Sequence, residues 1–318
     1  MCQSGGGQDK TLAVCCADWI TESVSVRLEM LQVARLAPKV LGDSAGLVRE
    51  FFLSQQNPDG GFKDRSGRSD LYYTVFGLEG LLALQAEVPT AAVAAYLDTF
   101  GDGAGLDFVH RCCLARCHAA LAVGGKRAGF ARGRELAAGL ENYRCADGGF
   151  NVIAGSIHGT AYGCFLGAAA YEDLGVPTPD PLRLVQCLKF LETPDGAWGN
   201  ERGLRQGATN STAAMVTLLR HLAMPVAPLV GDWLLSVAHR EGGFLAMPKA
   251  PIPDLLSTAT ALHALAGLER DLSPVRESCL DFIDTLWSNE GGFHGHWSDD
   301  ALDCEYTYYG LLALGHLS

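Results

Sequence analysis

The stretch Asn57–Thr74, NPDGGFKDRSGRSDLYYT, places a turn signal, two adjacent glycines and an aromatic residue directly before a helix-like segment. Variants of its DGGF core recur at four further places, Asp147–Phe150, Asp195–Trp198, Glu241–Phe244 and Glu290–Phe293. Self-similarity at a fixed period is the signature of a repeat architecture. The sequence therefore predicts an array of similar units.

The aromatic residues that end these turns, from Phe62 to Phe293, are separated by 88, 48, 46 and 49 residues. Because the first interval is almost twice the others, one degenerate unit is expected inside it. The glycine-rich stretch Gly101–Gly105 lies near the right place, without the aromatic residue. The sequence therefore predicts six units, over about residues 43–318.

Each unit has one helix-like segment before the glycines and one after them. The earlier segments, such as GLVREFFLSQQ, carry charged residues on one face, whereas the later segments, such as EYTYYGLLALGHL, carry almost none. A helix that is apolar all round is buried on most sides. We therefore expect pairs of outer and inner helices.

The last unit ends in GLLALGHLS, which is still apolar. An open stack of helix pairs usually needs polar caps, whereas closure into a ring removes the exposed end. We therefore expect an all-α fold, an (α/α)6 toroid in a single domain over residues 1–318. Residues 11–38 are expected to form a helix that plugs or flanks the ring, and residues 1–10 to be disordered.

The composition, 48% apolar and 19% charged residues, is typical of a soluble globular protein, and no apolar run approaches the roughly 20 residues of a membrane span. A net charge of −12 opposes electrostatic binding to nucleic acid or anionic lipid. The first residues lack the basic and apolar regions of a secretion signal, and the eleven scattered cysteines are expected to be reduced thiols. We expect a cytoplasmic protein that spans no membrane.

The repeat resembles a known motif. The segment FFLSQQNPDGGF, with Gln56, Gly60 and Phe62, is similar to the QW-type repeat of squalene and terpene cyclases and of protein prenyltransferase β subunits. The resemblance covers five clear units and one weak one. It implies a toroid that encloses an apolar cavity for an isoprenoid chain, with the chemistry at the mouth, where the inner helices begin.

Alignment of the units on Thr74 places comparable residues of the mouth in three columns. The first contains Asp70, Asp107, Ser156, Ala208, Asp254 and Asp303. The second, two residues later, contains Tyr72, Val109, His158, Asn210, Leu256 and Glu305. The third, one residue further, contains Tyr73, His110, Gly159, Ser211, Ser257 and Tyr306. Variable polar residues within uniform repeats suit a functional site, while an Asp in the first column equally suits a helix N-cap worth about 1 kcal/mol.

In prenyltransferase β subunits an Asp, a Cys and a His from these columns bind zinc, which lowers the pKa of a substrate thiol. Here Asp70 and His110 match, and Tyr72 stands where the Cys would be. The resemblance therefore implies Zn or Mg as the candidate cofactor, with an incomplete zinc set. The helical spacing of His110, Cys113 and Cys117 offers a second metal face, or plain core packing.

The resemblance also implies a site for an isoprenoid diphosphate, formed by one His and two basic residues. The residues that match in type and chain order are His158, Arg202 and Arg205. An alternative set is Arg65, Arg68 and Tyr73. Arginine suits this role because its planar guanidinium binds phosphate oxygens in pairs and keeps its charge.

Class II terpene cyclases carry a DxDD motif in the same columns, and its central acid protonates an alkene. The sequence DCEYT, Asp303–Thr307, resembles that motif, with Glu305 as the central acid and Tyr306 in place of the last Asp. Burial and a neighbouring carboxylate raise the pKa of such an acid. The resemblance therefore implies an acid centre of Asp303, Glu305 and Tyr306.

Three functions follow from these expectations. The first is prenyl transfer, in which diphosphate leaves toward the basic set and an acceptor in the cavity captures the allylic cation. The alternative is cycloisomerisation started by the acid centre. The third is a non-catalytic toroid that binds a lipid or a protein. The sequence leaves open the isoprenoid length, the acceptor, the oligomeric state and the presence of an α-type partner subunit.

Overall fold

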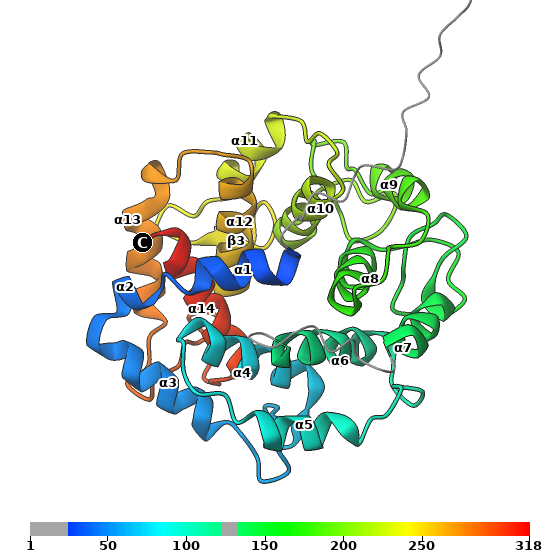
Figure 1. Ribbon diagram of the computed structural model, residues 1–318. Coiled ribbons are helices and arrows are strands. Elements are labelled where there is room, and N and C mark those ends of the chain that lie inside the picture. The colour runs from blue at the N-terminus through cyan, green and yellow to red at the C-terminus, as the bar shows by residue number, and fades with distance from the viewer. Residues whose placement is uncertain (1–24, 123–132) are drawn as a thin grey trace, which may run out of the picture.

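The computed structural model describes residues 25–122 and 133–318. Six inner helices form a ring in which each contacts the next, and the last contacts the first (Figure 1). They are α4 (Leu71–Ala83), α6 (Phe108–Leu121), α8 (Ala161–Leu174), α10 (Thr209–His221), α12 (Leu255–Gly267) and α14 (Cys304–His316). The expected toroid of helix pairs is confirmed, because α14 packs against both α12 and α4.

The outer layer consists of the helices that precede the glycine turns. They are α3 (Ala45–Ser54), α5 (Thr90–Asp98), α7 (Gly133–Leu140), α9 (Pro181–Lys189), α11 (Leu229–Ser236) and α13 (Ser273–Thr285). In α9, Leu184 and Leu188 are buried while Arg183 and Lys189 are exposed, as expected for a helix with one face on the core. The main hydrophobic core therefore lies between the two layers.

In five of the six units the glycine turn is hydrogen-bonded to the inner helix that follows it. The backbone N–H of Phe62 donates to Thr74 Oγ1 at 3.0 Å, and that hydroxyl donates to the carbonyl of Asp70 at 2.6 Å. The turn-to-helix bond recurs, at 3.1, 2.9 and 3.3 Å, in the pairs Trp198–Thr212, Phe244–Thr258 and Phe293–Thr307. A buried threonine therefore fixes where these inner helices begin.

The first glycine of each turn has a backbone conformation that residues with a Cβ avoid. Its φ lies between 84° and 97° at Gly60, Gly148, Gly196, Gly242 and Gly291. At Gly242 the outer helix α13 is also close, because a Cβ there would lie 1.8 Å from the carbonyl oxygen of Ser278. The recurrence of this glycine thus follows from both the turn and the packing.

Short strands and 3-10 turns complete the connections. Antiparallel pairs are formed by β1 (Phe62–Lys63) with β2 (Ser69–Asp70) and by β3 (Phe244–Leu245) with β4 (Pro253–Asp254). The 3-10 turns are η1 (Gly42–Ser44) and η2 (Glu141–Tyr143). The two hairpins lead directly into α4 and α12, at the mouth of the ring.

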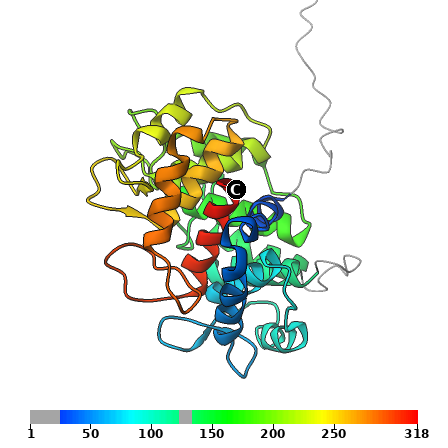
Figure 2. The ribbon, with the colours of Figure 1, turned by 90° about the vertical axis from the view of Figure 1, so that its left-hand side faces the viewer.

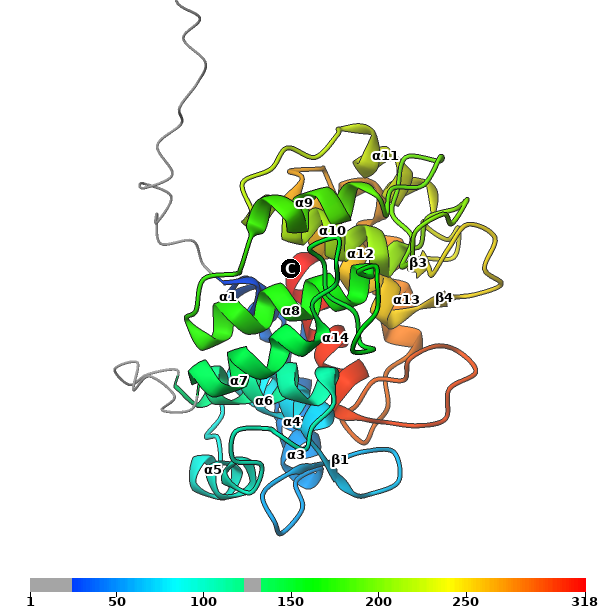
Figure 3. The ribbon, with the colours of Figure 1, turned by 90° about the vertical axis from the view of Figure 1, so that its right-hand side faces the viewer.

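Helix α1 (Val26–Ala34) lies across the end of the ring that is opposite the mouth. It contacts α4, α8, α10 and α14, and it binds residues near the ends of inner helices, as in the pair Arg27–Asp173 at 3.1 Å. Figures 2 and 3 show the loops of the glycine turns on one side of the molecule and α1 on the other. The ring is therefore covered by α1 at one end.

The helix expected over residues 11–38 can be compared with the structure only in part. Residues 1–24, including the stretch expected to be disordered, lie outside the described residues. Within the described part, α1 is followed by a turn and by α2 (Pro38–Leu41), which leads to α3. Among the helices described, none has the length and apolar character needed to cross a membrane.

We expect Thr258→Val to lower the free energy of unfolding by about 1–3 kcal/mol, because the buried N–H of Phe244 loses its acceptor. Urea unfolding followed by circular dichroism measures this change. Thr258→Ser is the matched control, since it keeps the hydroxyl and removes only a methyl group. An equal loss in the Ser variant would show that methyl packing, and not the hydrogen bond, stabilises the turn.

Candidate functional site

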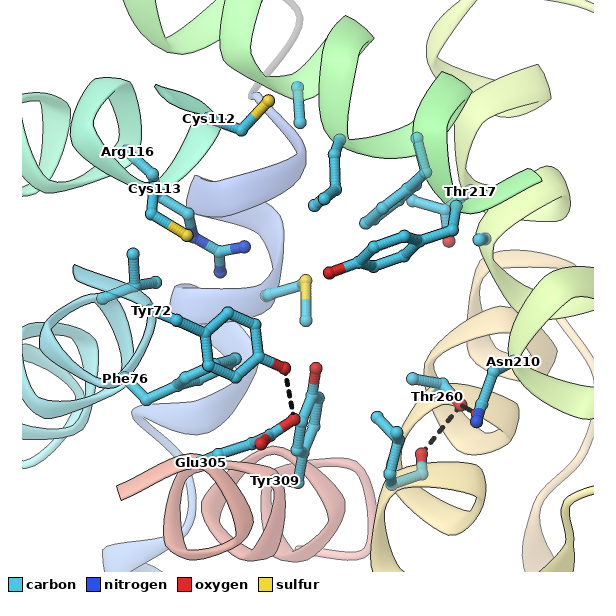
Figure 4. A pocket seen from close by; sticks show the side chains of 18 of the residues that line it. Tyr72, Phe76, Cys112, Cys113, Arg116, Asn210, Thr217, Thr260, Glu305 and Tyr309 are labelled. Carbon is cyan, nitrogen blue, oxygen red and sulfur yellow. Dashed lines mark hydrogen bonds between the residues drawn. The ribbon is translucent and has the colours of Figure 1, made fainter. Parts of the chain in front are cut away.

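A cavity lies along the axis of the ring (Figure 4). It leaves about 180 Å³ for the centres of water-sized molecules, whereas one water needs about 10–15 Å³ by that measure. All six inner helices contribute to its lining, and Met30 of α1 contributes from the closed end. Most of the lining is apolar or aromatic, so the ring has the hollow, apolar centre that the sequence predicts.

The lining follows the register of the inner helices. The second residue lines the cavity in five of them, namely Tyr72, Tyr162, Asn210, Leu256 and Glu305. One turn further, all six contribute a residue, namely Phe76, Cys113, Leu166, Ala214, Thr260 and Tyr309. Four of the six residues in the second column of the sequence alignment therefore line the cavity, namely Tyr72, Asn210, Leu256 and Glu305, whereas Val109 and His158 do not.

One unit of that alignment was wrong. Helix α8 begins at Ala161 with Thr160 as its N-cap, so Ser156, His158 and Gly159 lie in the preceding loop. The error arose because Cys164 takes the place of the anchoring threonine, and its Sγ accepts the N–H of Phe150 at 3.3 Å. The interval of 14 residues between these two partners, which other units share, was the signal that could have corrected it.

Glu305 lies at the mouth end of the cavity, close to Tyr72 (Figure 4). The Tyr72 hydroxyl donates to Glu305 Oε1 at 2.5 Å. Burial raises the pKa of Glu305 to about 7, although the hydrogen bond from Tyr72 opposes this rise. A carboxyl group with this pKa is protonated in about half of the molecules at neutral pH.

Aromatic rings form the wall beside this acid. The ring of Phe76 contacts Tyr72 edge to face, with centroids 5.1 Å apart, and contacts Tyr309 at 5.5 Å. Phe165 and Tyr162 line the cavity from α8. Because the faces of aromatic rings attract cations, this wall suits a positively charged intermediate.

The other two residues of the expected acid centre do not line the cavity. Asp303 caps α14 by accepting the Tyr306 N–H at 2.9 Å, and it accepts a bond from Arg65 Nε at 2.8 Å. Arg65 also pairs with Asp299 at 2.9 Å and lies 5.4 Å above the ring of Tyr306. Asp303 and Tyr306 therefore hold the beginning of α14, and only Glu305 faces the cavity.

The aspartates of the first column are helix N-caps. Each accepts a backbone N–H in the first turn of its inner helix, and they are Asp70, Asp107, Asp254 and Asp303. A capping oxygen satisfies a donor that the helix itself leaves unpaired. The capping interpretation of this column is thus confirmed.

The structure brings the metal candidates Asp70 and His110 together without forming a metal site. His110 Nε2 lies 3.1 Å from Asp70 Oδ2, and its Nδ1 lies 2.9 Å from Asp107 Oδ2. These hydrogen bonds, the one to Asp70 first, raise the pKa of His110 to about 9, so both ring nitrogens carry protons at neutral pH. The same contacts engage the carboxylate oxygens that Mg²⁺ would need.

The cysteines of the second candidate metal site, Cys113 and Cys117, do not form a metal site either. Cys113 lines the cavity, and Cys117 is buried against the carbonyl of Leu71, so burial raises the pKa of both thiols. Across residues 25–122 and 133–318, no three His, Cys, Asp or Glu side chains are grouped to hold a metal ion. The described residues therefore do not fit the zinc set of the prenyltransferases, and Zn or Mg stays a prediction.

The preferred diphosphate residues lie in loops and do not line the cavity. His158 Nδ1 is 3.0 Å from Arg202 Nη1, and Arg202 lies 4.2 Å above the ring of Phe190. His158, Arg202 and Arg205 are all exposed. The structure thus brings His158 and Arg202 together, but at exposed loop positions that do not line the cavity.

The alternative diphosphate set, Arg65, Arg68 and Tyr73, does not line the cavity either. Arg65 is paired with Asp299 and Asp303, which offset its charge. The side chain of Arg68 is 83% exposed, with Asp64 at 3.7 Å, and Tyr73 does not line the cavity. These residues therefore present no converging set of basic groups.

Charged residues at the closed end of the cavity were missed by the sequence analysis. Arg116 and Asp173 line the cavity there, and Arg116 binds both carboxylate oxygens of the fully buried Glu79 at 2.6 and 2.5 Å. The sequence did indicate two of these residues, because Glu79 and Arg116 are charged residues within otherwise apolar inner segments. Buried charges of this kind mark a site or a structural ion pair.

Comparison with known proteins places this fold among similar structures. A variant of the type II terpene cyclase MstE from Scytonema, with its product merosterolic acid A, superposes with a TM-score of 0.63 and 15% identity, over 88% of this chain and 97% of the cyclase. A protein from Actinoplanes gives 0.60 and 18%, over 86% and 98%. A glycosidase gives 0.56 and 12%, over 90% and 96%. At these identities the likeness shows the fold alone, which hosts several chemistries.

The sequence comparisons show the family. No curated protein matches this chain. The family model described as the prenyltransferase alpha-alpha toroid domain matches residues 5–123 and 213–317, which is more than half of the sequence. The chain therefore belongs to the prenyltransferase α/α toroid family.

Proposed function

We propose that this protein is a cycloisomerase of the terpene cyclase type, which takes an isoprenoid polyene into the axial cavity and protonates one of its alkenes from Glu305. The observation that carries the proposal is a buried, partly protonated carboxylic acid at the mouth end of an aromatic-walled cavity. Prenyl transfer, the first expectation from the sequence, relies on basic residues that do not line this cavity. The geometry therefore favours the alternative.

The hydrogen bond from Tyr72 decides which oxygen of Glu305 delivers the proton. Tyr72 donates to Oε1, which favours the proton of the neutral acid on Oε2. When this proton moves to an alkene carbon, the π electron pair forms the new C–H bond and a carboxylate remains. The bond from Tyr72 then becomes charge-assisted and stronger, which stabilises that carboxylate. Burial thus favours the protonated acid, and the hydrogen bond from Tyr72 stabilises the carboxylate that remains after the proton is released.

The cation that forms on the polyene would lie beside the rings of Phe76 and Tyr309. Ring faces stabilise a cation without supplying electrons that would end the reaction. The apolar wall limits water, which would otherwise capture the cation. Further alkenes of the chain can then attack it in turn, so that rings form and the product is an isomer of the substrate.

The substrate class rests on the shape and polarity of the cavity, with support from the cyclase that shares the fold. The MstE enzyme has also been solved with geranylgeranyl dihydroxybenzoate as its substrate. That compound is therefore a reasonable first probe, together with squalene, geranylgeraniol and geranylgeranyl diphosphate. The probes share a polyene chain and differ in the polar group at its end.

We expect Glu305→Gln to slow the conversion of these polyenes to isomers of equal mass by at least about 100-fold, because the amide cannot donate a proton to an alkene. Liquid chromatography with mass spectrometry measures the conversion. Tyr72→Phe should show a smaller loss, of about tenfold, since it removes one hydrogen bond to the conjugate base. Full activity in Glu305→Gln would contradict the proposal.

The double variant with Arg202→Ala and Arg205→Ala separates the two activities. Both residues are exposed and lie off the cavity, so we expect polyene conversion to be unchanged. Prenyl transfer would instead release pyrophosphate from geranylgeranyl diphosphate, and this double variant would bind that compound more weakly. A pyrophosphate assay and a binding titration distinguish these outcomes.

The activity should also depend on pH in a defined direction. Because only protonated Glu305 is active and its pKa is raised to about 7, kcat/KM should be constant at low pH and fall about tenfold per unit above pH 7. Tyr72→Phe removes an interaction that lowers this pKa, so its inflection should move to higher pH. Steady-state rates between pH 5 and 9 measure both curves. An inflection at the ordinary glutamate value, or an unmoved one, would assign the acid elsewhere.

A further inference from the structure

The closed end of the cavity carries a second carboxylate that the proposed protonation step does not use. Asp173, near the end of α8, lines the cavity, and its side chain is only 3% exposed. Its Oδ1 accepts a bond from Arg27 Nε of α1 at 3.1 Å. Within the described parts of the chain, no side chain or backbone group hydrogen-bonds Asp173 Oδ2.

Asp173 and Glu305 lie diagonally across the cavity. The ring order places α8 across from α14. Asp173 is twelve residues beyond the first residue of α8, and Glu305 is one residue beyond the first of α14. At about 1.5 Å of rise per residue, the two carboxyl groups are offset by roughly 16 Å along the axis. A polyene lying along the cavity would therefore extend from one toward the other.

We infer that Asp173 is the base that ends the reaction, a carboxylate that stabilises the last cation at the closed end and removes a proton from it. This inference rests on the proposed function. Its basis is the juxtaposition of an unengaged carboxylate oxygen with an apolar cavity, at the end opposite the acid.

The neighbouring groups keep this carboxylate ionised and leave its oxygen available. Burial raises the pKa of Asp173 to about 6, and the charges of Arg27 and Arg116 limit that rise, so the carboxylate predominates at neutral pH. The charge of Arg116 is offset by Glu79. Burial lowers the pKa of His263, which also lines this region, to about 4, so it carries no charge that would repel a cation.

The proton balance of the whole reaction closes with these two groups. Glu305 gives a proton to the first alkene, and ring closures carry the positive charge along the chain. Asp173 then takes a proton from a carbon next to the final cation, and the electron pair of that C–H bond becomes a new double bond. Product and substrate are isomers. Asp173 afterwards releases its proton to water, and Glu305 recovers one from water.

A binding measurement tests the carboxylate without requiring turnover. The probes are a farnesyl chain ending in trimethylammonium, which stands in for the final cation, and the neutral analogue ending in tert-butyl. We expect the protein to bind the ammonium probe at least about tenfold more tightly, because a desolvated charge pair is worth more than one in water. Asp173→Asn should remove this preference, and Asp173→Glu should retain part of it. Isothermal titration calorimetry measures both affinities.

Glu172→Gln is the matched control. Glu172 is adjacent on α8 and also holds α1, since it accepts the Val26 N–H at 3.0 Å and lies 3.5 Å from His221. It does not line the cavity. The preference for the ammonium probe should therefore survive in Glu172→Gln. If Asp173→Asn does not fold, the double variant Asp173→Asn with Arg27→Gln, which leaves no unpaired guanidinium, should show the same loss.

The products give a second readout that a structural role would not change. With geranylgeranyl dihydroxybenzoate, Asp173→Asn should still consume substrate, but it should yield other alkenes or an alcohol one water heavier. Glu305→Gln instead stops consumption. A cation preference without any conversion by the unaltered protein would refute the proposed function and leave the cation site standing. A preference that persists in Asp173→Asn, or that disappears equally in Glu172→Gln, overturns the inference about Asp173.

Discussion

The hydrogen bond between the glycine turn and the following inner helix, present in five of the six units, is the interaction on which the rest of this structure depends. The N–H of the turn's aromatic residue is buried, so it needs an acceptor, and the side chain 12 or 14 residues later supplies one. That acceptor sets the first residue of the inner helix. Because the helix period is fixed, it also decides which later residues face the axis. A local hydrogen bond thus determines the lining of a cavity that no single unit contains.

The contrast between Asp303 and Glu305 shows how this register assigns chemistry. Burial raises the pKa of both groups. The carboxylate of Asp303 accepts hydrogen bonds from the first turn of the helix and from Arg65. Glu305, two residues later, lines the cavity, and among the described residues its hydrogen-bond partner is Tyr72. The same apolar surroundings that suit a polyene also favour the neutral form of this acid. Burial at the apolar cavity therefore accounts for the raised pKa of Glu305.

Much of the fold could be predicted because the repeat consists of glycine, threonine and aromatic residues that form the turn and connect it to the inner helix. That pattern predicted the ring, the two helix layers and four residues that line the cavity, namely Tyr72, Asn210, Leu256 and Glu305. The position of His158 could not be found in this way, since Cys164 replaces the threonine on which the alignment depended. The resemblance placed Asp70 and His110 in one set, but the hydrogen bonds of His110 with Asp70 and Asp107 depend on how α4 packs against α6, which no repeat pattern measures.

The charged residues at the closed end depend on a still more distant contact. Arg27 and Asp173 are 146 residues apart, and they meet only because α1 lies across the ring. No periodicity within the repeats indicates where α1 should lie. The expected location of the protein, its single-domain organisation and its metal remain predictions, since nothing in the fold or in the comparisons measures them.

The position of α1 determines how small molecules can enter and leave the cavity. Because α1 covers one end of the cavity, substrate and product must pass through the same mouth. The product therefore leaves past the residues that the substrate contacted first. For the proposed cyclisation, the substrate would be a flexible chain on entry, whereas the product would be a rigid set of fused rings on release. Product release, rather than the chemical step, would then limit the rate of turnover, and the movement of the loops at the mouth would determine that rate.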